Sequence, residues 1–199
     1  MKNLDLQVGT ALVVVAHPDD ETIWMGGTIL RYQNISWTIF VLCRKSDPDR
    51  MPKFQKVAKF YNAQGIICDL EDEGVMGVRE SIPTIKTIIR RELRSRNFDY
   101  IFTHGKGGDY GHPRHEGVHG AVKELVRDKE LVGGKHFYFA YMMDESYGIA
   151  IPDPKHDLYL NLSAKEFQTK RNIVKKMYGF HEYSFENRSC SKIETFTMC

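Results

Sequence analysis

The residues able to do chemistry in this chain fall in two short segments rich in histidine and aspartate. The first, residues 16–21 with the sequence AHPDDE, directly follows the apolar run 12–15. That run predicts a buried strand that ends at the proline. His17, Asp19 and Asp20 should therefore lie at the carboxyl end of a central strand, which is where open α/β sheets bind their ligands.

The pairing of two carboxylates with a histidine favours a cation site over a simple turn. Burying Asp19 beside Asp20 is costly unless a cation neutralises them. The spacing lets His17 and Asp20 converge on one ion across a tight turn while Asp19 points elsewhere. The alternative is a solvated turn whose acids cap the helix that begins near Glu21. The preceding buried strand and histidine favour the site.

The second segment, residues 103–115 with the sequence THGKGGDYGHPRH, also follows a strand-like run. Its four glycines permit a phosphate cradle, but the P-loop spacing and the dinucleotide fingerprint are both missing. Its histidines are more informative. His115 is expected to be the third metal ligand and His112 to bond the substrate. His119, one helical turn further on, is expected to pack instead of binding metal.

Two histidines and one aspartate form a ligand set that suits Zn²⁺ with an open position for water. Zinc brings the pKa of a bound water towards ~7. Asp19 is then placed to accept the proton of that water. His112 or Tyr110 would stabilise the tetrahedral oxyanion or protonate the leaving nitrogen. This division of roles predicts hydrolysis of an amide or an ester.

Strand and helix patterns alternate along the chain, which predicts βαβ units and a parallel sheet with helices on both faces. Strands are expected over residues 11–16, 37–43, 65–70, 100–104 and 136–141. Helices are expected over residues 21–33, 52–64, 85–93 and 118–126, and from the capping box at Ser163 to about Tyr178. Residues 69–81 and 144–157 are expected to be long loops, and residues 1–199 to form one domain.

Composition narrows the class of protein. A net charge of +2 over 199 residues gives no reason to expect nucleic acid or an anionic membrane as a partner. The N-terminus does not read as a signal peptide, and no apolar stretch approaches ~20 residues. Cysteines 43, 68, 190 and 199 lack CxxC spacing, and Cys43 and Cys68 end or lie inside apolar runs, which favours buried free thiols in a reducing compartment. A cytoplasmic protein acting on a small molecule is expected, and a homo-oligomer is left open.

The two motifs together resemble the LmbE-like (PIG-L) family of zinc-dependent N-deacetylases. The resemblance rests on AHPDDE at 16–21, Gly26-Gly27-Thr28, and YGHPRH at 110–115. It implies an α/β fold, a Rossmann-like three-layer sandwich with a mainly parallel central sheet. It also implies removal of an acetyl group from an N-acetylglucosamine-type or related sugar-containing substrate.

Carried over by position, the resemblance assigns a role to each motif residue. His17, Asp20 and His115 would hold the zinc, and Asp19 would be the general base. His112 would stabilise the tetrahedral intermediate with assistance from Tyr110.

The chain departs from the family pattern around the substrate. Arg114 stands where the family commonly has an acid between the two histidines. The helix after the second strand carries Lys53 and Lys56 where the family often has arginine and glutamate, with Arg50 nearby. Arg50, Lys53 and Arg114 are therefore expected to contact the substrate, although lysine cannot reproduce the bidentate geometry of arginine.

Two rival functions remain open from the sequence. One is a metal-dependent esterase or phosphohydrolase in which Asp19 or Glu21 joins a second ion. The other is a non-catalytic sugar- or nucleotide-binding module on the same fold. The acids of residues 69–73 could also bind a second cation, but a solvated loop is expected there. Trp24 and Trp37 are expected in the core, not stacked on a sugar.

Overall fold

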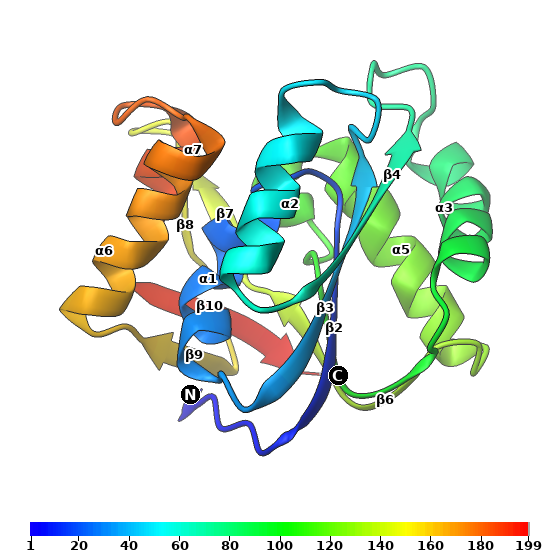
Figure 1. Ribbon diagram of the computed structural model, residues 1–199, viewed down its shortest axis with the longest axis horizontal. Coiled ribbons are helices and arrows are strands. Elements are labelled where there is room, and N and C mark those ends of the chain that lie inside the picture. The colour runs from blue at the N-terminus through cyan, green and yellow to red at the C-terminus, as the bar shows by residue number, and fades with distance from the viewer. Residues whose placement is uncertain (199) are drawn as a thin grey trace.

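A single large sheet runs through the molecule and sets the positions of all the motif residues (Figure 1). The computed structural model describes residues 1–198, and its main sheet has eight strands in the order β1-β9-β10-β6-β5-β2-β3-β4. The bounds are β1 Lys2–Asn3, β2 Gly9–Val15, β3 Ile35–Cys43, β4 Gln64–Leu70, β5 Asn97–Thr103, β6 Val132–Phe139, β9 Leu158–Asn161 and β10 Ile193–Met198. The five strands from β4 to β6 are parallel, and β10 is antiparallel to both of its neighbours.

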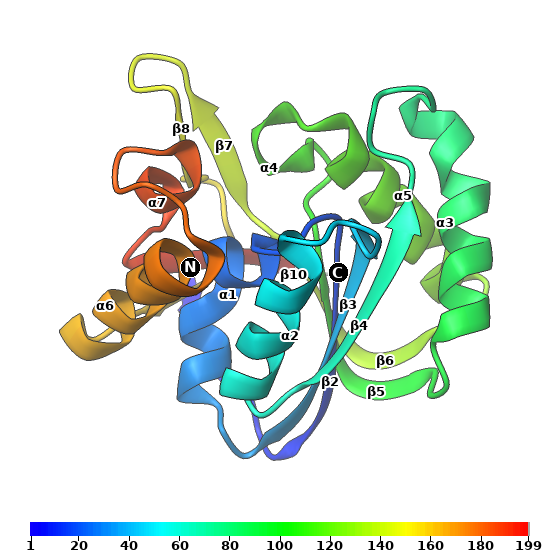
Figure 2. The same ribbon diagram turned by 45° about the horizontal axis from the view of Figure 1, so that its top comes forward.

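Helices cover both faces of this sheet and complete a three-layer sandwich (Figures 1 and 2). One face carries α1 (Asp20–Arg31), α2 (Arg50–Phe60) and α6 (Ala164–Asn172), which continues as the π-helical segment η1 (Ile173–Tyr178). The other face carries α3 (Val78–Glu92) and α5 (Pro113–Arg127).

Alternation along the strands divides the buried side chains between two cores. On β2, Val13 and Val15 pack under α1 and α2, while Leu12 and Val14 pack under α3 and α5. A strand whose every side chain is buried reads as a continuous apolar run, as expected for a parallel sheet covered on both sides. The predicted α/β fold with a mainly parallel sheet is therefore confirmed.

A hairpin and two short helices lie above the carboxyl ends of the strands. The hairpin consists of β7 (Tyr141–Asp144) and β8 (Ile149–Pro152), and the short helices are α4 (Gly108–Gly111) and α7 (Phe185–Ser189). Figure 2 shows the hairpin beside α7, and α4 near the top of α5. The prediction of a continuous loop over residues 144–157 was therefore wrong, because β8 pairs with β7 within it.

Other element boundaries also differ from the predictions for local reasons. The strand expected over residues 136–141 is divided, since β6 ends at Phe139 and the chain leaves the main sheet as β7. The helix expected over 52–64 ends at Phe60, and Asn62 then takes a positive φ of 54°. The loop expected over 69–81 is shorter, because α3 begins at Val78.

The site lies where the direction of chain winding changes. β2 lies between β3 and β5, so the chain runs outward through β3 and β4 and then returns to the opposite side of β2. At such a switch point the loops leaving two adjacent strands separate and form a crevice at their carboxyl ends. The AHPDDE segment follows β2, and the glycine-rich segment follows β5.

The remaining sequence expectations concern cysteines and membranes. Cys43, Cys68 and Cys190 are buried free thiols, whereas Cys199 lies outside the described residues. Within residues 1–198, none of the helices has the length and apolar character needed to cross a bilayer.

Candidate metal centre

Three side chains from the two motifs converge at the carboxyl end of β2. His17 Nδ1 lies 3.2 Å from His115 Nε2 and 3.3 Å from Asp20 Oδ2. The third edge, from His115 Nε2 to Asp20 Oδ2, measures 3.4 Å. Ligand atoms ~2.0–2.1 Å from a tetrahedral zinc are separated by roughly 3.3–3.4 Å. The triangle therefore has the size and the donor chemistry of a zinc site.

The second nitrogen of each histidine in this triangle faces a carboxylate. His17 Nε2 lies 3.0 Å from Asp72 Oδ1, and His115 Nδ1 lies 2.9 Å from Asp109 Oδ2. Metal-binding histidines nearly always use their other ring nitrogen in this way, because the contact fixes the ring orientation and raises its basicity. Both imidazoles are thus held with one nitrogen directed at the centre of the triangle.

Asp20 is fixed as firmly as the histidines. Its Oδ1 accepts a hydrogen bond from Trp24 Nε1 at 3.0 Å, and its Oδ2 accepts one from the backbone N–H of His17 at 2.7 Å. Burial alone would raise the pKa of Asp20, but the neighbouring His115, His17 and His104 hold that pKa well below its usual value. The lowered pKa favours an ionised Asp20, which is the form that can coordinate a cation.

The two histidine ligands differ in charge when no ion is bound. Burial lowers the pKa of His115 to about 4, against the opposing effect of Asp20. Burial would also lower the pKa of His17, but the hydrogen bonds to Asp20 and Asp72 outweigh it and raise that pKa to about 10. The raised pKa favours a protonated, positively charged His17 between the carboxylates of Asp20 and Asp72.

His104 supports the centre from below and is not a ligand. Its Nε2 accepts the backbone N–H of Ala16 at 2.9 Å, while its Nδ1 contacts Asp109 Oδ2 at 2.6 Å. These contacts fix the tautomer and occupy the lone pair of Nε2. The ring stacks on that of His115 with centroids 3.8 Å apart. His119 also packs as expected, with Nδ1 2.9 Å from the carbonyl oxygen of His104.

Asp19 stands beside the triangle in a strained conformation. Its φ of 122° is a backbone region that residues with side chains rarely adopt, and such strain costs on the order of 1–3 kcal/mol. Burial, followed by repulsion from Asp20, raises the pKa of Asp19 well above its usual value, against the effect of Arg50. A carboxylate with a raised pKa is suited to accept a proton near neutral pH.

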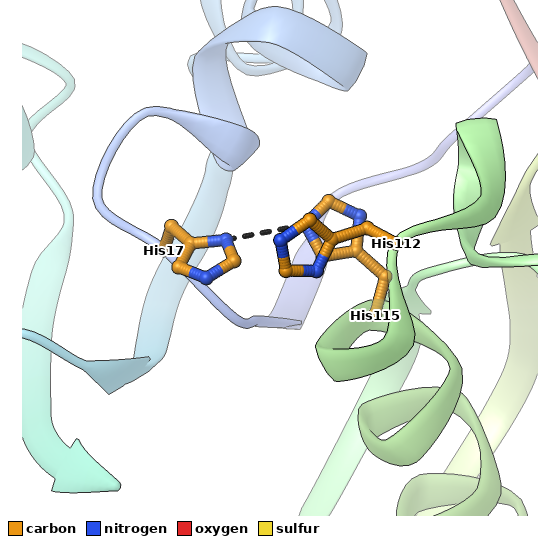
Figure 3. Close-up of side chains that lie close together, drawn as sticks. All are labelled: His17, His112 and His115. Atoms are coloured by element: carbon orange, nitrogen blue, oxygen red, sulfur yellow. Dashed lines mark hydrogen bonds between the residues drawn. The ribbon is translucent and has the colours of Figure 1, made fainter. Parts of the chain in front are cut away.

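His112 presents a donor to the same space. Its Nδ1 accepts the backbone N–H of Arg114 at 3.2 Å, so a neutral ring carries its proton on Nε2. Burial lowers the pKa of His112, and the positive charge of His17 lowers it further. Its ring lies 4.6 Å from that of His115, centroid to centroid, and Figure 3 shows it in front of that ring.

Other donor groupings are present, but they fit an ion less well. The ligand atoms of His17, His112 and His115 lie within 4.8 Å of one another, as do those of Asp20, His104 and His115. The His112 nitrogen facing Arg114 and the His104 nitrogen facing Ala16 both already accept backbone N–H groups. The triangle of His17, Asp20 and His115 remains the best candidate.

A cavity of about 400 Å³ opens above the centre. It is large enough for a small-molecule ligand. Its walls come from the motifs, from the start of α2 and from the C-terminal segment. The lining residues are His17, Asp19, Asp20, Ile23, Trp24, Arg44, Asp47, Asp49, Arg50, Asp72, Tyr110, His112, Phe185 and Glu186.

The three residues expected to contact substrate are placed differently. Arg50 lines the cavity, with Nη2 3.5 Å from Asp19 Oδ2 and its guanidinium 4.7 Å from the centroid of the Phe180 ring. Lys53 pairs with Asp49 at 2.6 Å and does not line the cavity. Arg114 is buried below the cavity and donates to a glutamate at 3.0 Å. The structure thus brings only Arg50 into the pocket.

Tyr110 and Trp24 form part of the cavity wall. The ring of Tyr110 lies 5.9 Å from that of Trp24 and 4.6 Å from that of Phe185. Burial, followed by the charge of Asp20, raises the pKa of Tyr110, so its hydroxyl stays protonated. Trp24 was expected only in the core, whereas it both packs there and hydrogen bonds to Asp20.

Sequence reasoning missed several residues of this site. Asp109 lies inside the glycine-rich motif, and its positive φ of 65° was not foreseen. Asp72 was included in an acidic run expected to be solvated, whereas its side chain is 12% exposed and faces His17. Phe185 and Glu186 come from the C-terminal tail, where no pattern indicated a role.

The Gly26-Gly27-Thr28 segment has a structural role behind the site. Helix α1 is kinked at Met25, which leaves the backbone N–H groups of Gly27 and Thr28 without helical acceptors. The carboxylate of Glu194 accepts both at 2.7 Å, and Lys170 Nζ neutralises it, also at 2.7 Å. The kink allows the first turn of α1 to present Asp20 while the rest of the helix packs on the sheet.

Comparisons with known proteins agree with this fold. The pseudoaglycone deacetylase Dbv21 superposes with a TM-score of 0.63 at 11% identity, over 97% of this chain and 98% of Dbv21. GalB, the 4-carboxy-2-hydroxymuconate hydratase of Pseudomonas putida, gives 0.62 at 13% identity, over 95% of this chain and 94% of GalB. An uncharacterized protein of Acanthamoeba polyphaga mimivirus is 22% identical over 188 residues, which cover 86% of this chain and 76% of that protein.

The family assignment comes from the N-terminal two thirds of the chain, which contain both histidine motifs. The family model described as PIG-L, GlcNAc-PI de-N-acetylase, matches residues 12–126. This range runs from β2 through α5 and includes every ligand of the triangle. The chain therefore belongs to the PIG-L family.

Proposed function

We propose that this protein is a zinc-dependent hydrolase that removes an N-acyl group, acetyl in the first instance, from a small sugar-containing substrate. The observation that carries the proposal is the triangle of His17, Asp20 and His115, whose edges of 3.2–3.4 Å match a tetrahedral zinc. Membership of the PIG-L family supports amide hydrolysis as the reaction.

The residues around the triangle account for the steps of such a reaction. Zinc, when bound, supplies a Lewis acid that polarises the amide carbonyl and lowers the pKa of the attacking water. Asp19 accepts the proton of that water, because its carboxylate lies beside the triangle without belonging to it and lines the cavity. The Nε2–H of His112 donates to the developing oxyanion, and the hydroxyl of Tyr110 assists.

Proton return to the leaving nitrogen completes the reaction. Asp19, protonated in the first step, is the nearest acid to the reacting atoms. It can pass that proton to the amine as the C–N bond breaks. Arg50 holds Asp19 in place and lies where it can donate to a carbonyl or hydroxyl oxygen of the substrate. Acetate and a free amine are the products.

A reaction with two metal ions has less support. That alternative needs a second acid, for which the sequence offered Asp19 or Glu21. Glu21 is fully buried, and its oxygens accept hydrogen bonds from Thr22, Tyr178 and the backbone of Asp19. These bonds occupy its carboxylate, and Glu21 does not line the cavity, so it is not available to a second ion there.

The test combines metal content with product release. We expect about one zinc per chain after equilibration and dialysis, and release of acetate from at least one member of a panel of N-acetylated amino sugars and their glycosides. Removal of zinc with a chelator should abolish the release, and added zinc should restore it. Zinc-loaded protein that binds panel members but releases no acetate would instead favour the non-catalytic binding module.

A further inference from the structure

The loop between β4 and α3 reaches the metal centre from outside both histidine motifs. We refer to its residues 71–77 as the Glu71 loop. Asp72 Oδ1 lies 3.0 Å from His17 Nε2, and Asp72 Oδ2 accepts a hydrogen bond from Arg44 Nη2 at 2.8 Å. With both oxygens engaged, the carboxylate cannot turn away from His17. The contact directs His17 Nδ1 towards Asp20 and His115.

Glu71 gives this loop its shape. Its carboxylate accepts the backbone N–H groups of Val75 at 2.9 Å and Met76 at 3.0 Å, and that of Glu73 as well. One side chain therefore organises the turn that carries Asp72. A loop held by its own carboxylate still has to be fixed relative to the rest of the protein.

Arg114 makes that connection from the first turn of α5. Its Nη2 donates to Glu71 Oε2 at 3.0 Å, and its Nε lies 3.9 Å from Asp72 Oδ1. The side chain is 5% exposed, and its Nε has no hydrogen-bond partner within residues 1–198. A buried unpaired donor is costly. A guanidinium can face two carboxylates at once, which a lysine ammonium does not reproduce.

We propose that Asp72, Glu71 and Arg114 form a positioning device for the metal centre. Asp72 orients His17 as a ligand, and Arg114 fixes the Glu71 loop so that Asp72 stays within reach. Arg114 therefore acts on the centre from below the cavity, in place of a contact with substrate. The inference rests on the proposed zinc centre. It adds Asp72 and Glu71, which lie outside both histidine motifs, and Arg114, which lies inside the second.

The first test compares two isosteric substitutions in one acidic run. Partners of metal-binding histidines typically contribute 10–100-fold to metal affinity. We expect Asp72→Asn to weaken zinc binding by about that factor in competition with a chromogenic chelator. Asp69→Asn is the matched control, because within residues 1–198 the Asp69 side chain bonds only to Ser46, so this variant should leave the affinity unchanged.

Two further readouts separate positioning from general stability. The absorption spectrum of the cobalt-substituted protein reports the ligand field, which should change in Asp72→Asn and not in Asp69→Asn. The thermal midpoint of the metal-free protein shows whether the variant is folded. A lower midpoint with an unchanged spectrum and unchanged zinc affinity would overturn the proposal and leave Asp72 a purely structural role.

A second variant tests the link through Arg114. Arg114→Lys should weaken zinc binding, and the double variant Asp72→Asn/Arg114→Lys should bind zinc no more weakly than Asp72→Asn alone, because Arg114 acts through Asp72. Additive losses would overturn the role of Arg114. Zinc affinity equal to wild type in Asp72→Asn would overturn the proposal as a whole. Failure of the wild-type protein to bind zinc would instead remove the proposed function.

Discussion

At the scale of single residues, Asp19 and Asp20 show how two adjacent carboxylates take opposite roles. The same buried turn holds the pKa of Asp20 well below its usual value and raises that of Asp19. The histidines surround Asp20, whereas Asp19 faces Arg50 at 3.5 Å and the cavity. Divergent pKa values in neighbouring acids are a recognised sign of divided catalytic work.

This division predicts a loss of turnover without a loss of metal. Asp19→Asn keeps the size of the side chain and removes its basicity. We expect kcat to fall on the order of 10²–10⁴-fold, as for the removal of a general base. Zinc content should stay at the wild-type level by atomic emission spectroscopy. A rate near that of wild type would assign the proton transfer to another group.

His115 and His119, the two histidines of α5, allow a matched pair of variants that tests metal binding. His115→Ala removes an atom of the triangle and should abolish stoichiometric zinc binding. His119→Ala, one helical turn away, removes the bond to the carbonyl of His104 and the ring contact with Tyr138, and should keep zinc. Isothermal titration of both variants measures the contrast. Equal zinc binding in the two variants would contradict the ligand assignment.

The sequence predicted the residues at the centre of the site better than those around it. His17, Asp20 and His115 lie in two compact motifs at strand ends, where the topology brings them together. Asp72 could not be identified in this way, because it lies in neither motif and nothing in the sequence links it to His17, 55 positions away. In sequence it was one of several acids in a run with no distinguishing pattern. The tertiary structure determines which of those acids are buried, and the sequence pattern does not show it.

At the scale of elements, the kink in α1 depends on glycine at a tight contact. A Cβ atom built on Gly27 would clash with the side chain of Leu162. Gly27→Ala should therefore lower the free energy of unfolding by about 1–3 kcal/mol through overpacking. Urea denaturation of metal-free protein measures this effect. Gly107→Ala is the control, since a Cβ there meets nothing within 4 Å. Equal stability of the two variants would contradict the close-packing role.

Periodicity predicted the types of the long elements because their apolar faces are strongly patterned. The five parallel strands and five long helices were all foreseen. The short elements α4, α7, β7 and β8 were not, since each has only four or five residues. Such segments are stabilised by their neighbours and carry little pattern of their own. α4 and α7 nevertheless contribute Tyr110, Phe185 and Glu186 to the cavity wall, which is why the part of the wall formed by α7 was not predicted.

At the scale of the whole molecule, the C-terminal segment completes both the sheet and the site. β9 and β10 extend the sheet beyond β6, and α6 packs on α1. Arg31 in α1 donates from Nε to Glu166 in α6 at 2.8 Å. This ion pair joins α1, in the N-terminal part of the chain, to the C-terminal segment that carries Phe185 and Glu186.

The ion pair between α1 and α6 makes stability depend on pH in a defined interval. The hydrogen bond from Arg31 lowers the pKa of Glu166 from 4.5 to about 2. A lowered folded-state pKa gives stability that is present above pH 4.5 and is lost as the pH falls towards 2. The difference in unfolding free energy between wild type and Glu166→Gln should therefore be constant at neutral pH and shrink across that interval. A difference that does not vary with pH would exclude the charge as its source.

Charge is balanced over the whole chain but not around the cavity. The net charge is +2, yet the cavity is lined by six carboxylates and two arginines. Both arginines already face acids, with Arg44 on Asp72 and Arg50 on Asp19. A dication held by the triangle would offset two of these negative charges. Asp49 is paired with Lys53 at 2.6 Å, so Asp47 and Glu186 still leave the rim of the cavity acidic.

An acidic rim should select against anionic substrates. Like charges ~4 Å apart near a protein surface repel by about 4 kcal/mol. We therefore expect kcat/KM for a phosphorylated N-acetyl amino sugar to be at least about tenfold lower than for its neutral analogue. Salt screens such repulsion, and the ratio should therefore narrow as the ionic strength rises. At low salt, Glu186→Gln should also bring kcat/KM for the phosphorylated substrate closer to that for its neutral analogue. Faster reaction of the phosphorylated substrate would show instead that Arg44 and Arg50 leave their acids to bind the phosphate.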